Sequence, residues 1–69
     1  MTDRLLTTRQ AALILNLRES TLEQWRWNGR GPEYVKLNRA VRYRLADVEA
    51  FVERRVFSST TAVHRGDLE

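Results

Sequence analysis

The segment Gly29-Arg30-Gly31-Pro32 constrains the fold of this chain more than any other feature. Two glycines and a proline within four residues end a helix and redirect the backbone, so no regular element continues through them. Helical periodicity precedes the segment and strand-like alternation follows it. The 69 residues suffice for one domain at most, with a small core. We therefore expect helices before this segment, strands directly after it, and one shared core.

Two short helices are predicted before this segment. Thr7 and Gln10 have the spacing of a capping box, in which each side chain accepts a hydrogen bond from the other residue's backbone amide. The helix that they begin should run to about Leu15, because Asn16 is suited to the left-handed conformation that ends helices. A second helix is expected from about Glu19 to Asn28. So short a connection between two helices is typical of a helix-turn-helix motif.

A β-hairpin is predicted after the segment, because residues 34–37 and 41–44 each alternate in polarity. The loop Asn38-Arg39-Ala40 has a suitable length for a hairpin connection. A lone two-stranded hairpin is only marginally stable, so its apolar face must pack against the helices. That face is predicted to carry Val35, Leu37, Val41 and Tyr43. The opposite face is predicted to carry Lys36, Arg42 and Arg44, with Arg39 at the tip.

A third helix is predicted from about Asp47 to Val56. Its apolar stripe consists of Val48, Phe51, Val52 and Val56. Tyr43 and Phe51 are expected in the core rather than on a nucleic-acid stacking surface. Beyond Phe57 the composition becomes polar, so residues 1–57 are expected to form the domain and residues 58–69 a C-terminal tail.

Basic residues are concentrated in the middle of the chain. Between Arg26 and Arg44 there are six bases and one acid, Glu33, whereas the rest of the chain carries six bases and eight acids. Eleven of the twelve bases are arginines, whose planar group suits phosphates and guanine edges. Such a cluster indicates a nucleic-acid surface, although a solvated arginine-rich surface explains the charge alone equally well.

Trp25 and Trp27 should lie on opposite faces of the second helix, because residues two apart point about 200° apart. Leu22 and Trp25 form the stripe expected to face the core. Ser20 and Gln24 share the opposite face with Trp27. A large exposed aromatic side chain usually marks an interface. Trp27 is therefore expected to contact DNA, the base of the hairpin, or another protein chain.

Several classes of protein are disfavoured by what the sequence lacks. With no cysteine and one histidine, His64, it offers neither a disulfide framework nor a zinc site, and no cofactor is expected. The longest apolar run has five residues, against about 20 for a membrane span. The carboxylates Asp47, Glu49 and Glu53 have no histidine partner, so catalysis is not expected. We expect a soluble, cytoplasmic, non-enzymatic protein.

Three runs in unbroken order carry a specific resemblance: LTTRQAALILNLRESTLEQW, GRGPEYVKL and VRYRLADVEAFV. Together they cover residues 5 to about 55 and resemble the MerR-like winged helix-turn-helix domains of phage excisionases and AlpA-type regulators. Asn16 and Asn38 stand where that family has glycines, and both tolerate positive φ. Arg18 and Ala46 replace its usual serine caps on the second and third helices.

The resemblance implies a mainly α fold with about three helices and a two-stranded β-hairpin as the wing. It implies a DNA-binding protein of excisionase type, in a bacterial host cell. Such proteins bind repeated sites beside a phage attachment site, bend the duplex and assist a tyrosine-type integrase. The implied partners are double-stranded DNA, the integrase and further copies of the chain on adjacent sites. An AlpA-like transcriptional regulator is the first alternative, and a protein-interaction module such as an antitoxin or adaptor is the second.

The candidate DNA-contacting residues lie on the second helix and the wing. Gln24 can bond an adenine edge in two places, with Ser20 beside it, whereas Thr21 is better placed for a phosphate. Arg39 is the candidate for minor-groove insertion. Glu23 either accepts a hydrogen bond from a cytosine amine or pairs with nearby basic side chains such as Arg26. The full set is Ser20, Thr21, Glu23, Gln24, Arg26, Trp27, Arg30, Lys36, Arg39, Arg42 and Arg44.

The missing serine caps predict modest thermal stability for the isolated protein. Losing a side-chain cap typically costs about 1 kcal/mol, a large fraction of what so small a domain has. Thermal unfolding without DNA, followed by circular dichroism, should give a melting temperature no higher than that of ordinary mesophilic domains. A clearly higher melting temperature contradicts this expectation.

Overall fold

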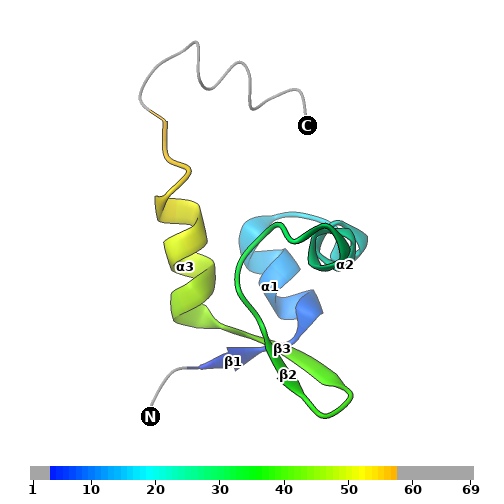
Figure 1. Cartoon of the computed structure of the whole chain (residues 1–69). Coiled ribbons are helices and arrows are strands. Elements are labelled where there is room, and N and C mark those ends of the chain that lie inside the picture. The colour runs from blue at the N-terminus through cyan, green and yellow to red at the C-terminus, as the bar shows by residue number, and fades with distance from the viewer. Residues whose placement is uncertain (1–3, 58–69) are drawn as a thin grey trace.

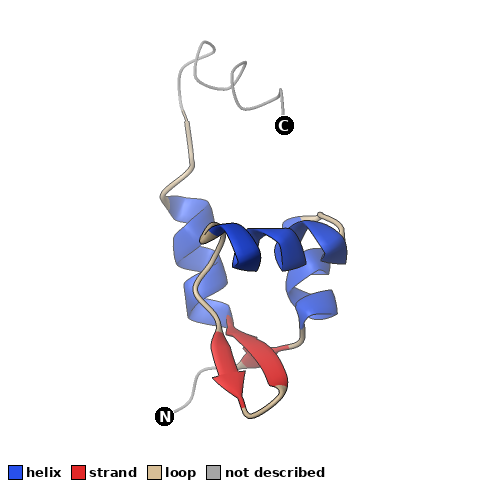
Figure 2. Cartoon of the chain, turned by 45° about the vertical axis from the view of Figure 1, so that its right-hand side comes forward, coloured by secondary structure: helices blue, strands red, loops and turns tan. Residues whose placement is uncertain are grey.

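The computed structural model describes residues 4–57, which form three helices and a three-stranded antiparallel sheet (Figure 1). The sheet lies at one end of the molecule with the helices to one side of it (Figure 2). The predicted fold class, a winged helix-turn-helix, is confirmed. The predicted C-terminal tail, residues 58–69, lies outside the described residues. In chain order the elements are β1 (Leu5–Leu6), α1 (Thr8–Leu15), α2 (Glu19–Asn28), β2 (Val35–Leu37), β3 (Ala40–Arg44) and α3 (Leu45–Glu53).

The capping residues of α1 are those that the sequence predicts. The Gln10 amide donates to Thr7 Oγ1 at 3.1 Å, and the Thr7 amide donates to Gln10 Oε1 at 2.9 Å. Asn16 ends the helix with a φ of 58°, and the Leu17 amide donates to the Ala12 carbonyl at 2.9 Å. These contacts satisfy backbone groups at both helix ends. They fix where the chain leaves α1 and enters the turn to α2.

The helix α2 has the predicted bounds, with a weak start and a strong end. At its N-cap, Arg18 is extended and makes no side-chain capping hydrogen bond, as the missing serine predicts. At its C-terminus Gly29 has a φ of 71°, and the Arg30 amide donates to the Trp25 carbonyl at 2.7 Å. The orientation of α2 is therefore set mainly by the side chains that it buries and by its C-terminal turn.

The hairpin turn is one residue shorter than predicted. Leu37 lies opposite Ala40, so only Asn38 and Arg39 lie between the strands. Asn38 has a φ of 59°, which two-residue hairpin turns require at their first central position. Ala40 therefore belongs to β3 rather than to the loop.

This shorter turn makes the predicted assignment of the hairpin faces wrong. Residues directly opposite in an antiparallel pair share a face, and Val35 lies opposite Arg42 while Lys36 lies opposite Val41. A shift of one residue moves every side chain of a strand to the other face. Lys36 therefore shares a face with Val41 and Tyr43, and Arg42 lies on the other face with Val35. The basic side chains of the wing are divided between two faces.

A third strand, β1, was not predicted. Leu5 pairs with Arg44 and Leu6 with Tyr43, which makes β3 the central strand of a sheet ordered β1-β3-β2. Leu6 is fully buried. Two residues are too few to show strand alternation, so the sequence pattern around Leu6 indicates only the start of α1. The added strand widens the sheet and pairs with the end of β3 that lies at the base of the wing.

The third helix begins earlier and ends earlier than predicted. It spans Leu45–Glu53 and follows β3 without a loop. Because the helix ends at Glu53, Val56 lies outside it, and Val52 and Val56 are exposed rather than buried. The predicted stripe is therefore correct for Val48 and Phe51 only.

The N-cap of α3 is Arg44 and not Ala46, which lies inside the helix. Arg44 is also the last residue of β3, so one residue ends the strand and begins the helix. It makes no side-chain capping hydrogen bond, but its Nε lies 2.7 Å from Asp47 Oδ2. That ion pair puts a carboxylate in the first turn, where the helix dipole favours negative charge.

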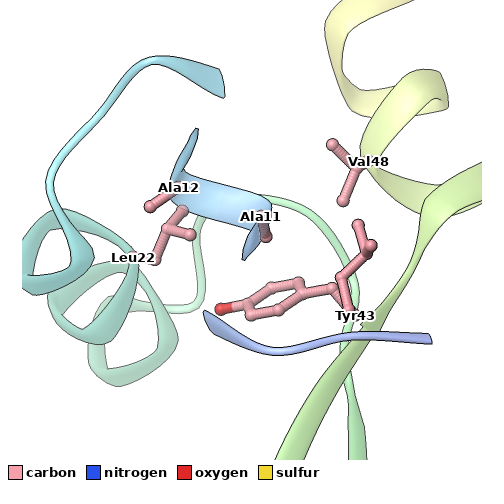
Figure 3. Packing of buried hydrophobic residues seen from close by; sticks show 6 residues of the cluster. Ala11, Ala12, Leu22, Tyr43 and Val48 are labelled. Atoms are coloured by element: carbon pink, nitrogen blue, oxygen red, sulfur yellow. The ribbon is translucent and has the colours of Figure 1, made fainter. Parts of the chain in front are cut away.

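The core is small and receives side chains from the sheet and all three helices. Tyr43 is its largest fully buried side chain, and in Figure 3 it lies beneath Ala11 with its hydroxyl directed toward the side where Leu22 lies. Phe51 is buried beside the half-buried Trp25, with ring centroids 5.6 Å apart. The buried cluster is Leu6, Ala11, Ala12, Leu22, Tyr43 and Val48.

Two glycines after α2 give a matched pair of substitutions. Both have positive φ, but a Cβ on Gly31 would lie 2.7 Å from Trp25 Cε3, whereas a Cβ on Gly29 meets nothing within 4 Å. Gly29→Ala should cost about 1 to 2 kcal/mol of unfolding free energy from backbone strain alone. Gly31→Ala should cost a further 1 to 3 kcal/mol, roughly, from overpacking against Trp25. Urea denaturation of both variants measures the difference, and equal losses would contradict this packing.

Candidate nucleic-acid interface

The outward face of α2 carries the polar side chains that the sequence predicts for it. Ser20, Glu23 and Gln24 are exposed, Thr21 is half-buried, and Leu22 on the inner side is fully buried. Ser20, Glu23 and Gln24 are accessible to solvent. The face is therefore free to meet the edges of base pairs in a groove.

Trp27 is 89% exposed, at the C-terminal end of α2. One of its predicted alternatives, packing against the base of the hairpin, is therefore wrong. Burying a large aromatic ring stabilises a fold, and the exposed ring of Trp27 does not provide this stabilisation in the isolated chain. The two remaining alternatives are a contact with DNA and a contact with another protein chain.

The helix α2 and the hairpin lie on the same side of α3 (Figure 1). In Figure 1 both lie to the right of α3, and in Figure 2, where that side is turned forward, α2 passes in front of α1 and α3 with the hairpin below it. A helix and a neighbouring hairpin arranged in this way can meet a groove and the adjacent backbone of one duplex.

The basic residues of this side differ in their surroundings. Arg30, Lys36 and Arg39 are exposed, with Arg39 in the hairpin turn. Arg42 is half-buried, and its Nη1 donates to the Val41 carbonyl at 2.8 Å. Arg44 is exposed but forms the ion pair with Asp47. The first three residues therefore present the most accessible positive charge.

Arg26, one of the candidate DNA-contacting residues, is turned inward. Its Nη1 donates to Tyr43 Oη at 2.8 Å and to Thr8 Oγ1 at 3.3 Å. Its guanidinium carbon lies 5.7 Å from the ring centroid of Tyr34 and 5.9 Å from that of Tyr43. These contacts join α2 to α1, to the segment before β2 and to β3.

Sequence reasoning missed the partners of Arg26, although one signal pointed to its position. Arg26 follows the buried Leu22 by four residues, so both lie on the same face of α2. The hydroxyl of Tyr43, in turn, requires a partner when it is buried. The pairing of these two side chains depends on the tertiary arrangement of α2 and β3, which the sequence pattern does not give.

The described residues show no arrangement suited to metal binding. No three histidine, cysteine or carboxylate side chains gather within residues 4–57. In the same part of the chain, no helix is both long and apolar enough to cross a membrane. The chemistry available on this side of the molecule is that of hydrogen-bond donors, acceptors and positive charge.

Two helices joined by a tight turn and followed by a basic wing define the class of winged helix-turn-helix DNA-binding proteins. A family model described as a helix-turn-helix domain matches residues 5–56, which is most of the chain. The chain belongs to this family, a small helix-turn-helix DNA-binding family that includes excisionase-like and AlpA-like proteins. No curated protein matches the chain.

The exposure of Trp27 leads to a prediction that separates folding from binding. Trp27→Ala should change the unfolding free energy by no more than about 0.5 kcal/mol, because the side chain is almost fully exposed to solvent. It should weaken DNA binding about tenfold if the ring contacts the duplex. Fluorescence anisotropy with a labelled duplex measures the affinity, and urea denaturation measures the stability.

A matched control is Phe57→Ala, which truncates another exposed aromatic side chain, in the segment that follows α3. This variant should bind DNA like the unaltered protein. Equal affinities for Trp27→Ala and Phe57→Ala would exclude Trp27 from the DNA interface and favour a protein partner.

Proposed function

We propose that this protein binds double-stranded DNA with α2 in the major groove and the wing on the adjacent backbone or minor groove. The observation that carries the proposal is that α2, on which Ser20 and Gln24 are exposed, and the basic hairpin lie on the same side of α3 (Figure 1). Membership of a DNA-binding family supports it. The proposal assigns α2 to reading bases and the wing to fixing position.

On α2, Gln24 is the main candidate for direct readout, because its amide matches the donor and acceptor of an adenine edge. Ser20 lies one turn earlier on the same exposed face. Thr21, near the helix N-terminus, is suited to a phosphate, where backbone amides add to the attraction. Glu23 repels phosphates and can accept from a cytosine amine. Trp27 is suited to a sugar or a thymine methyl group.

On the wing, Arg39 is the candidate for minor-groove insertion, because it lies in the turn and is exposed. Arg30 and Lys36 are proposed to contact phosphates that flank this minor groove. Arg42 and Arg44 are proposed to contribute as well, each from a position already held by a partner in the fold.

The finer proposal is an architectural role of excisionase type, in the cytoplasm of a bacterial host. Such a protein binds repeated sites beside an attachment site, bends the duplex and helps a tyrosine-type integrase to excise a prophage. The resemblance of the three motifs supports this role. One short recognition helix provides few base contacts, so several copies on adjacent sites provide the specificity.

Two other functions make different predictions on the same protein. An AlpA-like regulator uses the same fold at a promoter, where footprinting shows one site instead of phased repeats with bending. A protein-interaction module, such as an antitoxin or adaptor, uses Trp27 to bind protein. In that case, the double variant Gln24→Ala with Arg39→Ala binds DNA as tightly as the unaltered protein.

The electrostatic part of the proposal predicts the salt dependence of binding. If each monomer neutralises about four or five phosphates, log K should fall with log salt concentration with a slope of about −4. Anisotropy titrations of a random-sequence duplex over a range of NaCl concentrations measure this slope. A slope near zero would contradict the proposed phosphate contacts. Footprinting on the attachment region of the source genome separates the excisionase role from the regulator role.

A further inference from the structure

The geometry points to Arg26 as a positioning residue that fixes the wing relative to the recognition helix, in place of the phosphate contact that its charge suggests. This inference rests on the proposed DNA binding and concerns how the two contacting elements are held in register. Its basis is the set of contacts between the Arg26 guanidinium and three other parts of the fold.

The recognition helix has little direct backbone packing against the sheet. The closely packed pairs of elements join α1 to α2, α3 and the sheet, and β3 to both neighbouring strands and α3, but α2 and the sheet are not among them. The wing is therefore held relative to α2 by side chains, by α1 and by the connecting segment 29–34. A side chain that spans α2 and β3 directly has a large effect on their mutual orientation.

Arg26 is such a side chain. From α2 it donates to Tyr43 on β3 at 2.8 Å and to Thr8, the first residue of α1, at 3.3 Å. The Tyr43 side chain is only 1% exposed, and its hydroxyl points toward α2 in the core (Figure 3). A buried hydroxyl that loses its partner is costly, so the bond strongly favours one placement of β3 beside α2.

The rings of Tyr34 and Tyr43 add a second constraint. The guanidinium lies within 6 Å of both ring centroids, and the rings are tilted by 54° with centroids 6.1 Å apart. Tyr34 directly precedes β2, so these contacts reach the first strand of the wing as well as the central one. Lysine lacks the planar group that can bond and stack in this way.

The same contacts argue against Arg26 as a phosphate ligand. Arg26 is half-buried, and its Nη1 already donates to both Tyr43 and Thr8, so moving that nitrogen to a phosphate would break both bonds. The exposed Arg30 and Lys36 reach solvent without such a loss. Arg26 therefore acts on DNA binding through the wing, by keeping the wing in its binding orientation before the duplex arrives.

The effect on affinity follows from pre-organisation. A wing that samples several orientations must be ordered on binding, and the apparent affinity falls by the fraction of molecules in the competent orientation. Arg26→Lys keeps the charge and loses the planar group, whereas Tyr43→Phe keeps every charge and removes one hydroxyl. Both should raise Kd about tenfold, if about one molecule in ten keeps the competent wing orientation.

The experiment measures Kd and its salt dependence with the full chain and a duplex that the unaltered protein selects from a random library. The variants are Arg26→Lys, Arg26→Met and Tyr43→Phe, each at a temperature where circular dichroism shows it folded. Arg55→Lys is the matched control, because it removes another planar group that stacks on an aromatic ring, 4.0 Å from the centroid of Phe51 on α3. The control should leave Kd unchanged.

The expected result is a similar rise in Kd for all three variants with an unchanged salt slope. A merely structural role is separated by combining Tyr43→Phe with a second substitution. When Tyr43→Phe is combined with Arg39→Ala on the wing, Kd should rise by less than the product of the two single fold-changes. A wing that has lost its DNA contact no longer has to be ordered on binding. With Gln24→Ala on α2, the losses should multiply.

Two results overturn the inference while leaving the proposed function intact. One is a salt slope weakened by about one in Arg26→Met together with an unchanged Kd in Tyr43→Phe, which identifies Arg26 as a phosphate contact. The other is a lower melting temperature with unchanged Kd in all three variants, which identifies a purely structural role. Failure of the unaltered protein to bind any duplex at low salt overturns the proposed function itself, and the inference with it.

Discussion

The rest of this structure depends on the packing of the Tyr43 side chain in the core. It lies on the central strand, pairs with Leu6 of β1 through the backbone, and carries the largest fully buried side chain. Its ring fills the space beneath Ala11, and its hydroxyl receives the hydrogen bond from Arg26 (Figure 3). In a domain with so small a core, one side chain that touches the sheet and two helices largely determines how these elements are arranged.

Features that depend on a few neighbouring residues could be predicted from the sequence. The capping box of Thr7 and Gln10, the left-handed Asn16 and the bounds of α2 all follow from interactions within about four residues, and the structure has each of them. The exposed face of α2 was predictable for the same reason, because helical periodicity places Gln24 opposite Leu22. The part of the candidate site that lies on α2 could therefore be predicted from helix capping and helical periodicity.

Features that depend on pairing between distant residues could not be predicted. The register of the hairpin follows from a turn of two residues instead of three, and that difference moves Lys36 to the other face of the wing. The strand β1 is too short to show a pattern, and the inward turn of Arg26 depends on where β3 places Tyr43. The charge pattern located the wing as the basic element but did not show which arginines the fold itself uses.

The direct junction between β3 and α3 has a mechanical consequence. Arg44 ends the strand and caps the helix, so no flexible linker separates the wing from α3. Because β3 and α3 meet at this residue, a rotation of the hairpin about its base also changes the position of α3. Val52 is exposed on that helix, so its position is tied to that of β3 by the chain itself.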